Sequence, residues 1–301
     1  MLNLKPYSPL TAGVIINLSM GLLYGWSVLL APLEVSLDSD RASVSLAYSL
    51  ATIFFTIGMF VMYKLLNWLS LDKLALAMGA LGATGLALAG LEESIFTLII
   101  GFGAGYGFAA GVSYFIAISA ASHPSPIPIT IAMSINVSAF AVGGVLWPPI
   151  FEALIRTIGP HGTLIIAAII LLTASFIAFL LLNYSKVKSP DSKGDGLFRD
   201  ILTNKPRVVI ALFVGMTLLA ITSLMVIGHA SGMAAELNAS NIVLAPMITN
   251  FAYIAGALLV GQICRVINGR LVLIGISFLT GLVLIILWLF FFLNGKFCNH
   301  L

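Results

Sequence analysis

Three asparagines and three tyrosines lie inside long apolar stretches of this chain. Their amide and phenol groups are neutral hydrogen-bonding groups, and each amide can both donate and accept. Such a set can hold a small anion or a zwitterion, but it offers no paired carboxylates, no Ser/His dyad and no metal-ligand cluster. The pattern therefore predicts a solute-binding site and no enzyme, metal or cofactor. The candidate residues are Asn17, Tyr24, Tyr106, Asn136, Asn250 and Tyr253.

The same residues also have a simpler interpretation. Asparagines hold transmembrane helices together by hydrogen bonds, and aromatic residues collect at membrane interfaces. At a rise of about 1.5 Å per residue, Asn17, Asn250 and Tyr106 fall near the middle of their stretches. Asn136 lies somewhat inward, Tyr253 lies one turn beyond Asn250, and Tyr24 lies in the outer third. Both interpretations remain open at the level of sequence.

The apolar stretches that carry these residues are long enough to cross a membrane. The chain is 60% hydrophobic and 8% charged, with a mean hydropathy of +1.11, whereas soluble domains carry roughly 25% charged residues. A bilayer core of about 30 Å requires about 20 apolar residues per helix. We therefore expect an all-α polytopic bundle of about nine transmembrane helices, with no soluble domain. The expected spans are 8–33, 43–63, 74–91, 95–121, 129–153, 162–184, 208–230, 242–264 and 271–293.

Basic residues predict the orientation of these spans. With a cytoplasmic N-terminus, eleven of the fourteen lysines and arginines lie inside, which agrees with the positive-inside rule. Arg41, Arg156 and Lys296 lie outside in that arrangement. We therefore expect an integral protein of the plasma (inner) membrane with its N-terminus in the cytoplasm.

One polar segment divides the chain. Residues 185–207 (SKVKSPDSKGDGLFRDILTNKPR) are rich in Gly, Pro, Ser and charge, which is typical of a linker. The expected organisation is a six-helix N-terminal bundle over 1–184, a cytoplasmic linker over 185–207 and a partial C-terminal bundle of three helices over 208–301. A faint similarity between 37–61 and 237–261 agrees with two related halves.

The layout and several motifs resemble the major facilitator superfamily. Residues 21–34 (GLLYGWSVLLAPLE) look like helix 1 of its oxalate/formate antiporter branch, which is monocarboxylate-transporter-like. Residues 103–107 (GAGYG) resemble the Gly-rich helix 4 of that branch, and 143–149 (GGVLWPP) resemble the end of helix 5 in many antiporters. The resemblance implies a secondary transporter and places Tyr24 at the border of a substrate chamber. It also implies that the last three helices are lacking.

The departures from the family pattern concern selectivity. The loop after the second span reads MYKLLNWLSLDK and lacks most of the family's Asp-Arg signature. The branch has an arginine in helix 8 that pairs with a substrate carboxylate, and Ala257 lies near that position here. The second positively charged residue of that branch lies in its helix 11. The selectivity of that branch for dicarboxylates is therefore not expected in this chain.

A further set of small and bending residues is expected to set helix packing and hinge motion. Small residues four apart allow helices to approach closely, and proline bends a helix. Static packing would select the same residues. The set comprises Gly101, Gly105, Gly107, Gly111, Gly143, Gly144 and Pro148.

These observations favour a transporter of a small organic anion, a monocarboxylate or related acid, working by alternating access between two bundles. Its expected partners are the solute, a coupling ion that the sequence leaves open, and the lipid bilayer, with no nucleic acid. The alternative is a truncated, transport-inactive member or a fragment of a longer transporter, in which a homodimer could restore the missing wall. A membrane enzyme or a channel is disfavoured, because neither catalytic clusters nor a filter-like loop occurs.

Overall fold

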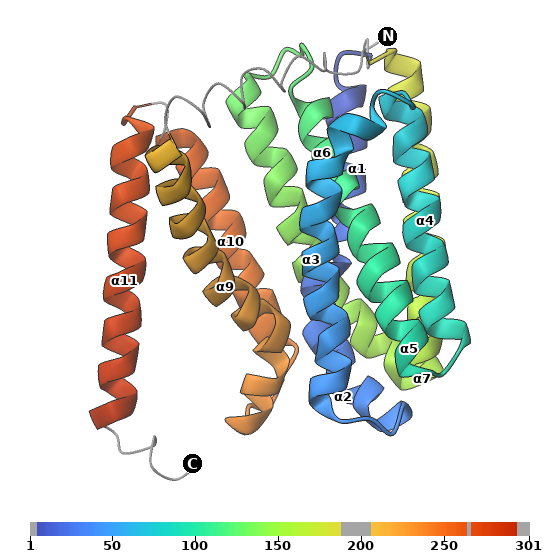
Figure 1. Cartoon of the computed structure of the whole chain (residues 1–301), viewed down its shortest axis with the longest axis vertical. Coiled ribbons are helices and arrows are strands. Elements are labelled where there is room, and N and C mark those ends of the chain that lie inside the picture. Colours follow the sequence, from blue (N-terminus) through green and yellow to red (C-terminus); the bar gives the residue numbers. More distant parts are fainter. Residues whose placement is uncertain (1–4, 188–205, 264–265, 294–301) are drawn as a thin grey trace. The chain divides into compact units, whose positions relative to one another are not determined.

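The computed structural model describes residues 5–187, 206–263 and 266–293, and every regular element in these ranges is helical. This confirms the predicted all-α fold class. Figure 1 shows the long helices and their labels. The elements are α1 (Ser8–Met20), η1 (Gly21–Gly25), α2 (Trp26–Ser36), α3 (Arg41–Leu65), α4 (Leu71–Leu91), α5 (Ile95–Leu98), η2 (Ile99–Tyr106), α6 (Gly107–Ala121), α7 (Ile129–Ser185), α9 (Pro206–Glu236), α10 (Leu244–Ile263) and α11 (Gly269–Leu293).

Within the described part of the chain, five helical stretches are long and apolar enough to cross a membrane. The first joins α1, η1 and α2, and the fourth joins α5, η2 and α6, so both spans are interrupted by non-α turns. η1 is a 3₁₀ segment and η2 is a π-helix. Irregular turns of both kinds within helices often occur at functional sites. The five stretches are Ser8–Ser36, Arg41–Leu65, Leu71–Leu91, Ile95–Ala121 and Ile129–Ser185.

α7 consists of two helices joined at Gly159. Its 57 residues would extend for about 85 Å as one straight helix, nearly three times the thickness of a bilayer core. Gly159 has φ 74° and ψ 174°, which breaks the helix, and Pro160 follows directly. Spans 129–153 and 162–184 were expected to be separate, and the structure extends both helices up to Gly159. The backbone is helical at Gly143, Gly144 and Pro148, so Gly159 marks the break in this element.

α3 begins at a side-chain cap. The Asp40 carboxylate accepts hydrogen bonds from the backbone N–H and the hydroxyl of Ser43, at 3.1 and 2.6 Å. Aspartate is a favoured N-cap because it satisfies a backbone N–H that has no partner within the helix. The Ser43 hydrogen bonds lower the pKa of Asp40. The cap fixes the start of α3 and with it the position of the neighbouring Arg41.

Close contacts at glycines give the relative directions of the helices. A Cβ at Gly21 would meet Phe140 and Gly143, and one at Gly25 would meet Trp147 and Phe151. Positions therefore increase together along the first span and the first half of α7, so these segments run parallel. Along α4 the order is reversed, because Gly79 meets Ser175 whereas Gly90 meets His161 and Ile165. α4 and the second half of α7 are therefore antiparallel, as in an up-and-down bundle.

The glycines of the fourth span pack on two different neighbours. Gly103, Gly107 and Gly111 lie against α3 at Ala47, Ala51 and Phe55, in a register of four residues on both helices. Gly101 and Gly105 instead lie against Gly85 of α4. Against α3 and against α4 alike, a Cβ would overlap or crowd the neighbouring backbone at most of these glycine positions. The predicted close-packing role of this series is consistent with these contacts.

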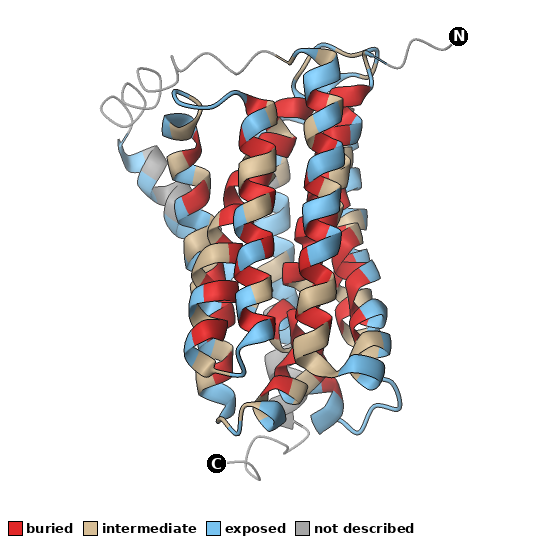
Figure 2. Ribbon diagram, turned by 90° about the vertical axis from the view of Figure 1, so that its right-hand side faces the viewer, coloured by how far each residue is buried: buried red, intermediate tan, exposed pale blue. Residues whose placement is uncertain are grey.

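Burial follows the pattern of a membrane bundle. Figure 2 shows buried residues on the helix faces that pack together and exposed residues on the outward faces. Large apolar side chains are exposed along the helices, with Phe60 at 72% and Leu91 at 72%. Lipid tails are apolar, so such residues carry little penalty in a bilayer. Charged side chains are absent from the fully buried residues of the described ranges.

Two compact units are distinguished by internal contacts, residues 1–257 and 258–301. The first contains α1 to α9 and most of α10, and the second contains the end of α10 and α11. Most of the predicted linker 185–207 lies outside the described residues. The proposed division into bundles over 1–184 and 208–301 therefore remains a prediction.

Candidate solute-binding site

Tyr24 lies on η1, where the first span approaches α7 most closely. A Cβ at Gly21 would overlap the carbonyl oxygen of Phe140, so only glycine permits this approach. The Tyr24 ring then lies edge-on to Phe140, with ring centroids 4.9 Å apart and planes at 78°. Edge-to-face pairs of this kind are favoured by the charge distribution of aromatic rings. The 3₁₀ segment thus presents a phenol between two packed helices.

Asn250 of α10 reaches the same place from a distant part of the sequence. Its Nδ2 donates to the carbonyl of Pro246 at 2.8 Å and to that of Gly144 at 3.3 Å. The side chain is fully buried, and its Oδ1 has no hydrogen-bond partner. A Cβ at Gly144 would lie 2.6 Å from Oδ1 and 2.7 Å from the Cβ of Tyr24. Gly144 therefore makes the space in which Asn250 and Tyr24 meet.

Tyr253 joins this group from the next turn of α10. Its ring centroid lies 6.0 Å from that of Tyr24, with planes at 74°. The phenols of Tyr48 and Tyr114 also lie near that of Tyr24. Three candidates predicted from sequence, Tyr24, Asn250 and Tyr253, are thus brought together.

Further aromatic residues complete the surroundings of Tyr24. Phe140 contacts Tyr114 edge-on at 5.5 Å and Phe55 at 6.0 Å. We call Tyr24, Phe55, Tyr114, Phe140 and Tyr253 the aromatic cluster. It draws on η1, α3, α6, α7 and α10 and contains three phenols and no charged group.

Tyr48 of α3 lies beside the aromatic cluster. It is 7% exposed, and its hydroxyl group has no hydrogen-bond partner. Its ring stacks on Trp26 at 6.1 Å with planes at 19°. Trp26 is itself 1% exposed, so its ring packs inside the bundle. A buried phenol without a partner is a ready donor for a bound solute, since such groups are normally satisfied.

Sequence reasoning missed Tyr48, Phe55, Tyr114 and Phe140. Each is a single aromatic residue in an apolar stretch, where lipid-facing and buried aromatics look alike. The only available signal was depth, since Tyr114 and Phe140 lie well inside their spans. Their convergence on Tyr24 depends on the contacts between helices that the glycines permit.

Asn17 and Asn136 form a separate pair. Nδ2 of Asn17 donates to the backbone carbonyl of Asn136 at 2.7 Å, which joins α1 to α7. Both side chains are fully buried, and a Cβ at Gly13 would lie 2.7 Å from the Asn136 amide. The Asn136 amide has no hydrogen-bond partner. We interpret the pair as a helix-packing contact, because the Asn17 hydrogen bond joins α1 directly to α7.

Tyr106 is also held by another helix. Its hydroxyl group donates to the carbonyl of Met20 at 2.6 Å, and the residue is fully buried. Its ring stacks on Phe102 at 5.2 Å. The Met20 carbonyl directly precedes η1, so the bond supports the segment that presents Tyr24. We interpret Tyr106 as a positioning residue.

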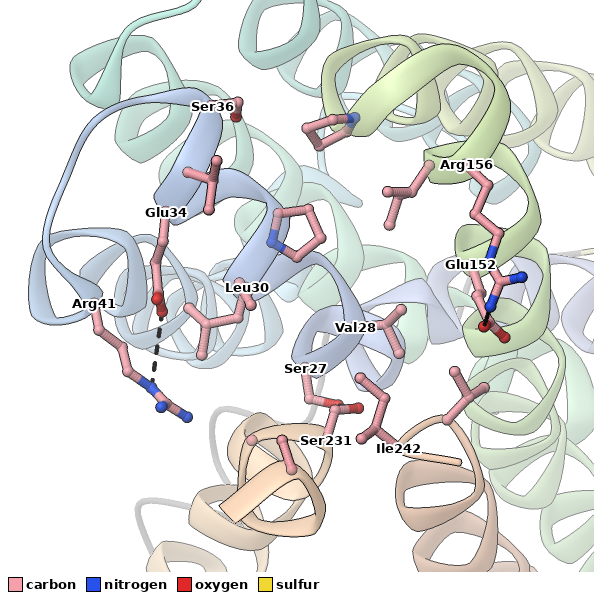
Figure 3. Close-up of a pocket in the computed structure, with 18 of the residues that line it drawn as sticks. Ser27, Val28, Leu30, Glu34, Ser36, Arg41, Glu152, Arg156, Ser231 and Ile242 are labelled. Atoms are coloured by element: carbon pink, nitrogen blue, oxygen red, sulfur yellow. Dashed lines mark hydrogen bonds and ion pairs between the residues drawn. The ribbon is translucent and has the colours of Figure 1, made fainter. Parts of the chain in front are cut away.

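A pocket of about 870 Å³ opens at the end of the bundle that carries Arg41 and Arg156. The distribution of basic residues predicts that this end faces outside, and we call it the outer end. Figure 3 shows Ser27 and Ser231 pointing toward each other and two ion pairs, Arg41–Glu34 and Arg156–Glu152. Most other lining residues are apolar. Within the described ranges, no group of three or more His, Cys, Asp or Glu residues could hold a metal ion.

This bundle, with irregular turns, glycine-packed helices and a neutral polar site, is of the membrane-transporter kind. The family profile described as Major Facilitator Superfamily matches residues 12–298. The chain therefore belongs to the Major Facilitator Superfamily and is an integral membrane protein of the transporter class, not an enzyme. Membership of this superfamily, which the sequence motifs predicted, is therefore confirmed.

One curated relative carries no assigned solute. The uncharacterized MFS-type transporter YhjX of Escherichia coli (strain K12) is 25% identical over 182 residues. The match covers 60% of this chain and 45% of that protein, so less than half of the relative's length is matched.

Proposed function

We propose that the chain is a secondary transporter that moves a small organic anion, a monocarboxylate or related acid, by alternating access. The observation that carries the proposal is that Tyr24 and the buried Asn250 meet at Gly144, with Tyr253 against the Tyr24 ring. Sites in secondary transporters typically lie between helices of the two halves, near interrupted helices, and Tyr24 on the 3₁₀ segment and Asn250 on α10 fit that pattern. The sequence resemblance to the oxalate/formate antiporter branch supports the same class of solute.

The chemistry of the site favours a carboxylate that also carries a donor group. Phenol hydroxyls of Tyr24 and Tyr253 can donate to a carboxylate, and the unpartnered Oδ1 of Asn250 can accept from a hydroxyl or an ammonium group. The aromatic cluster supplies an apolar wall around the carbon skeleton. A small hydroxy acid or a zwitterion would use all of these features at once.

Uptake into proteoliposomes tests the proposal directly. The purified 301-residue chain should take up one or more labelled small carboxylates with saturable kinetics. Tyr24→Phe or Asn250→Ala should lower kcat/KM by about tenfold, because losing one buried hydrogen bond to the solute costs about 1.4 kcal/mol. Tyr184→Phe is the matched control, since Tyr184 is 60% exposed on α7, and it should leave uptake unchanged.

The outcomes separate this proposal from the alternative. Uptake that survives both substitutions would place the solute elsewhere. No uptake by a folded sample would favour a chain that does not transport by itself, and the same assay should then be repeated with a longer C-terminus.

A further inference from the structure

The pocket at the outer end has the size and the walls of a site for a small organic molecule. Its volume of about 870 Å³ lies in the range of ligand pockets, roughly 300–1,000 Å³, whose lining is typically apolar with a few polar groups. Tyr24, Asn250 and Tyr253 are not among the described residues that line it, so it is separate from the proposed solute site. Its apolar lining includes Val28, Leu30, Ile155, Ile242 and Val243.

Most polar groups in this pocket already have partners. The hydroxyl groups of Ser27 and Ser231 lie 3.1 Å apart and share a hydrogen bond, and that of Ser36 donates to a backbone carbonyl of its own helix. Arg156 donates to Glu152 one turn away on α7, and these two charges offset each other. These groups therefore offer a ligand little that they do not already have.

The wall formed by α2, the start of α3 and the end of α9 differs in this respect. Arg41 lies 3.8 Å from Oε1 of Glu34 and 3.7 Å from Oε1 of Glu236, and both distances exceed the length of a hydrogen bond. Oε1 of Glu34 is buried and has no hydrogen-bond partner. Such oxygens are normally satisfied, because removing a polar group from water without a partner is costly. This wall therefore lacks a hydrogen-bond donor.

The charge on this wall indicates which kind of donor it lacks. Two carboxylates face one guanidinium, which leaves a formal charge of −1. Figure 3 shows the Arg41–Glu34 pair on one side of the pocket and the Arg156–Glu152 pair on the other. An anion in this pocket would meet three carboxylates and two guanidiniums. A cation that carries N–H groups would supply both the missing donor and the missing positive charge.

We propose that the pocket at the outer end is a binding site for amphipathic amines. The ammonium group donates to Glu34 and Glu236 beside Arg41, and the hydrocarbon part lies against the apolar walls. Hydrogen bonds between an ammonium group and a carboxylate are roughly twice as strong as neutral ones. The site does not depend on which solute the chain transports.

Titration with hexylamine tests the site. Hexylamine is a cation at neutral pH, and isothermal titration of the 301-residue chain in nanodiscs should show saturable binding after subtraction of empty nanodiscs. Hexan-1-ol has the same hydrocarbon chain without the charge and should bind at least tenfold more weakly. Equal binding of the two compounds, or no binding of hexylamine to a folded sample, would overturn the proposal.

Substitution of the carboxylates locates the ammonium group. Glu34→Gln should weaken hexylamine binding at least tenfold, because it removes the charge beside the unpartnered oxygen. Glu236→Gln should have a smaller effect, because its side chain is 74% exposed to water. Glu93→Gln is the matched control, since Glu93 is an exposed carboxylate in the turn after α4 and does not line the pocket. An equal loss with Glu93→Gln would show that the amine responds only to overall charge.

Filling the pocket tests its volume without changing a charge. Ala235 is exposed on α9 and lines the pocket, so Ala235→Trp should lower hexylamine binding several-fold. Ala239→Trp is the matched control, because Ala239 is exposed just beyond α9 and does not line the pocket. Unchanged binding by Ala235→Trp would place the amine elsewhere.

A last variant separates this pocket from the proposed solute site. Tyr24→Phe should leave hexylamine binding unchanged, because Tyr24 does not line the pocket. Weaker binding by this variant would show that the amine occupies the site at Tyr24, and the proposal would then be wrong. Because every reading is of binding and not of transport, a failure to take up carboxylates leaves this test intact.

Discussion

Asparagines with similar sequence surroundings serve different purposes in this molecule. Asn250 uses its donor to hold α10 against α7, while its acceptor stays free beside Tyr24. Asn17 also donates to a neighbouring helix, at Asn136, and its Oδ1 also has no hydrogen-bond partner, but it belongs to the packed contact of Gly13 with Asn136 and not to the surroundings of Tyr24. The distinction depends on neighbouring backbone and not on residue type, so depth along the span could not make it.

Substitution of Asn17 tests this distinction. Asn17→Ala should lower the free energy of unfolding by about 0.6–2 kcal/mol, the range for a hydrogen bond between membrane helices. It should leave the KM for the solute unchanged, because we place Asn17 outside the site. Unfolding in mixed micelles and uptake kinetics measure the two quantities. A raised KM with unchanged stability would return Asn17 to the binding site.

At the scale of elements, glycine positions decide which helices approach closely. The series Gly103, Gly107 and Gly111 matches Ala47, Ala51 and Phe55 turn by turn, so α3 packs against η2 and α6 with the backbones nearly in contact. This register fixes where Phe55 and Tyr114 can meet, at 5.7 Å between ring centroids. The packing of these helices therefore also brings two rings of the aromatic cluster together.

A single added methyl group should disturb this register. Gly111→Ala places a Cβ against the backbone of Phe55, and overpacking of this kind costs about 1–3 kcal/mol. Gly256→Ala on α10 is the matched control, because nothing lies within 4 Å of its Cβ position. Thermal unfolding should show a lower Tm for the first variant only. Equal Tm values would show that α3 and α6 adjust without cost.

Much of the helical architecture could be predicted because apolar length and turn residues are local properties. Stretches such as 43–63 and 95–121 correspond to helices that the structure also shows. The site was less accessible, because Asn250 and Gly144 are 106 residues apart in sequence and meet through tertiary packing. Tyr48 carried no local signal, and Phe140 carried none beyond its depth in the span. The 3₁₀ turn at Tyr24 and the π-helix before Gly107 likewise result from neighbours, not from propensity.

At the scale of the whole molecule, the asymmetry of charge predicts an orientation that labelling can measure. Ala42 and Ser70 are exposed residues at opposite ends of the span that contains α3. In intact cells, an impermeant maleimide should label Ala42→Cys, whereas Ser70→Cys should react only after permeabilisation. Because both report on the same helix, each is the control for the other. The reverse pattern would place the N-terminus outside.

Because the proposed site at Tyr24 is neutral, we expect the membrane voltage to act directly on the transport of an anion. In the proposed site only phenols and an amide would contact the solute, so no side chain there would cancel the charge of a monocarboxylate. Each one-way crossing then moves one elementary charge through the field, which corresponds to about 2.3 kcal/mol per 100 mV. An interior-negative potential opposes entry of the bare anion and favours its export. Exchange of one monoanion for another moves no net charge, so the membrane potential does not contribute to its driving force.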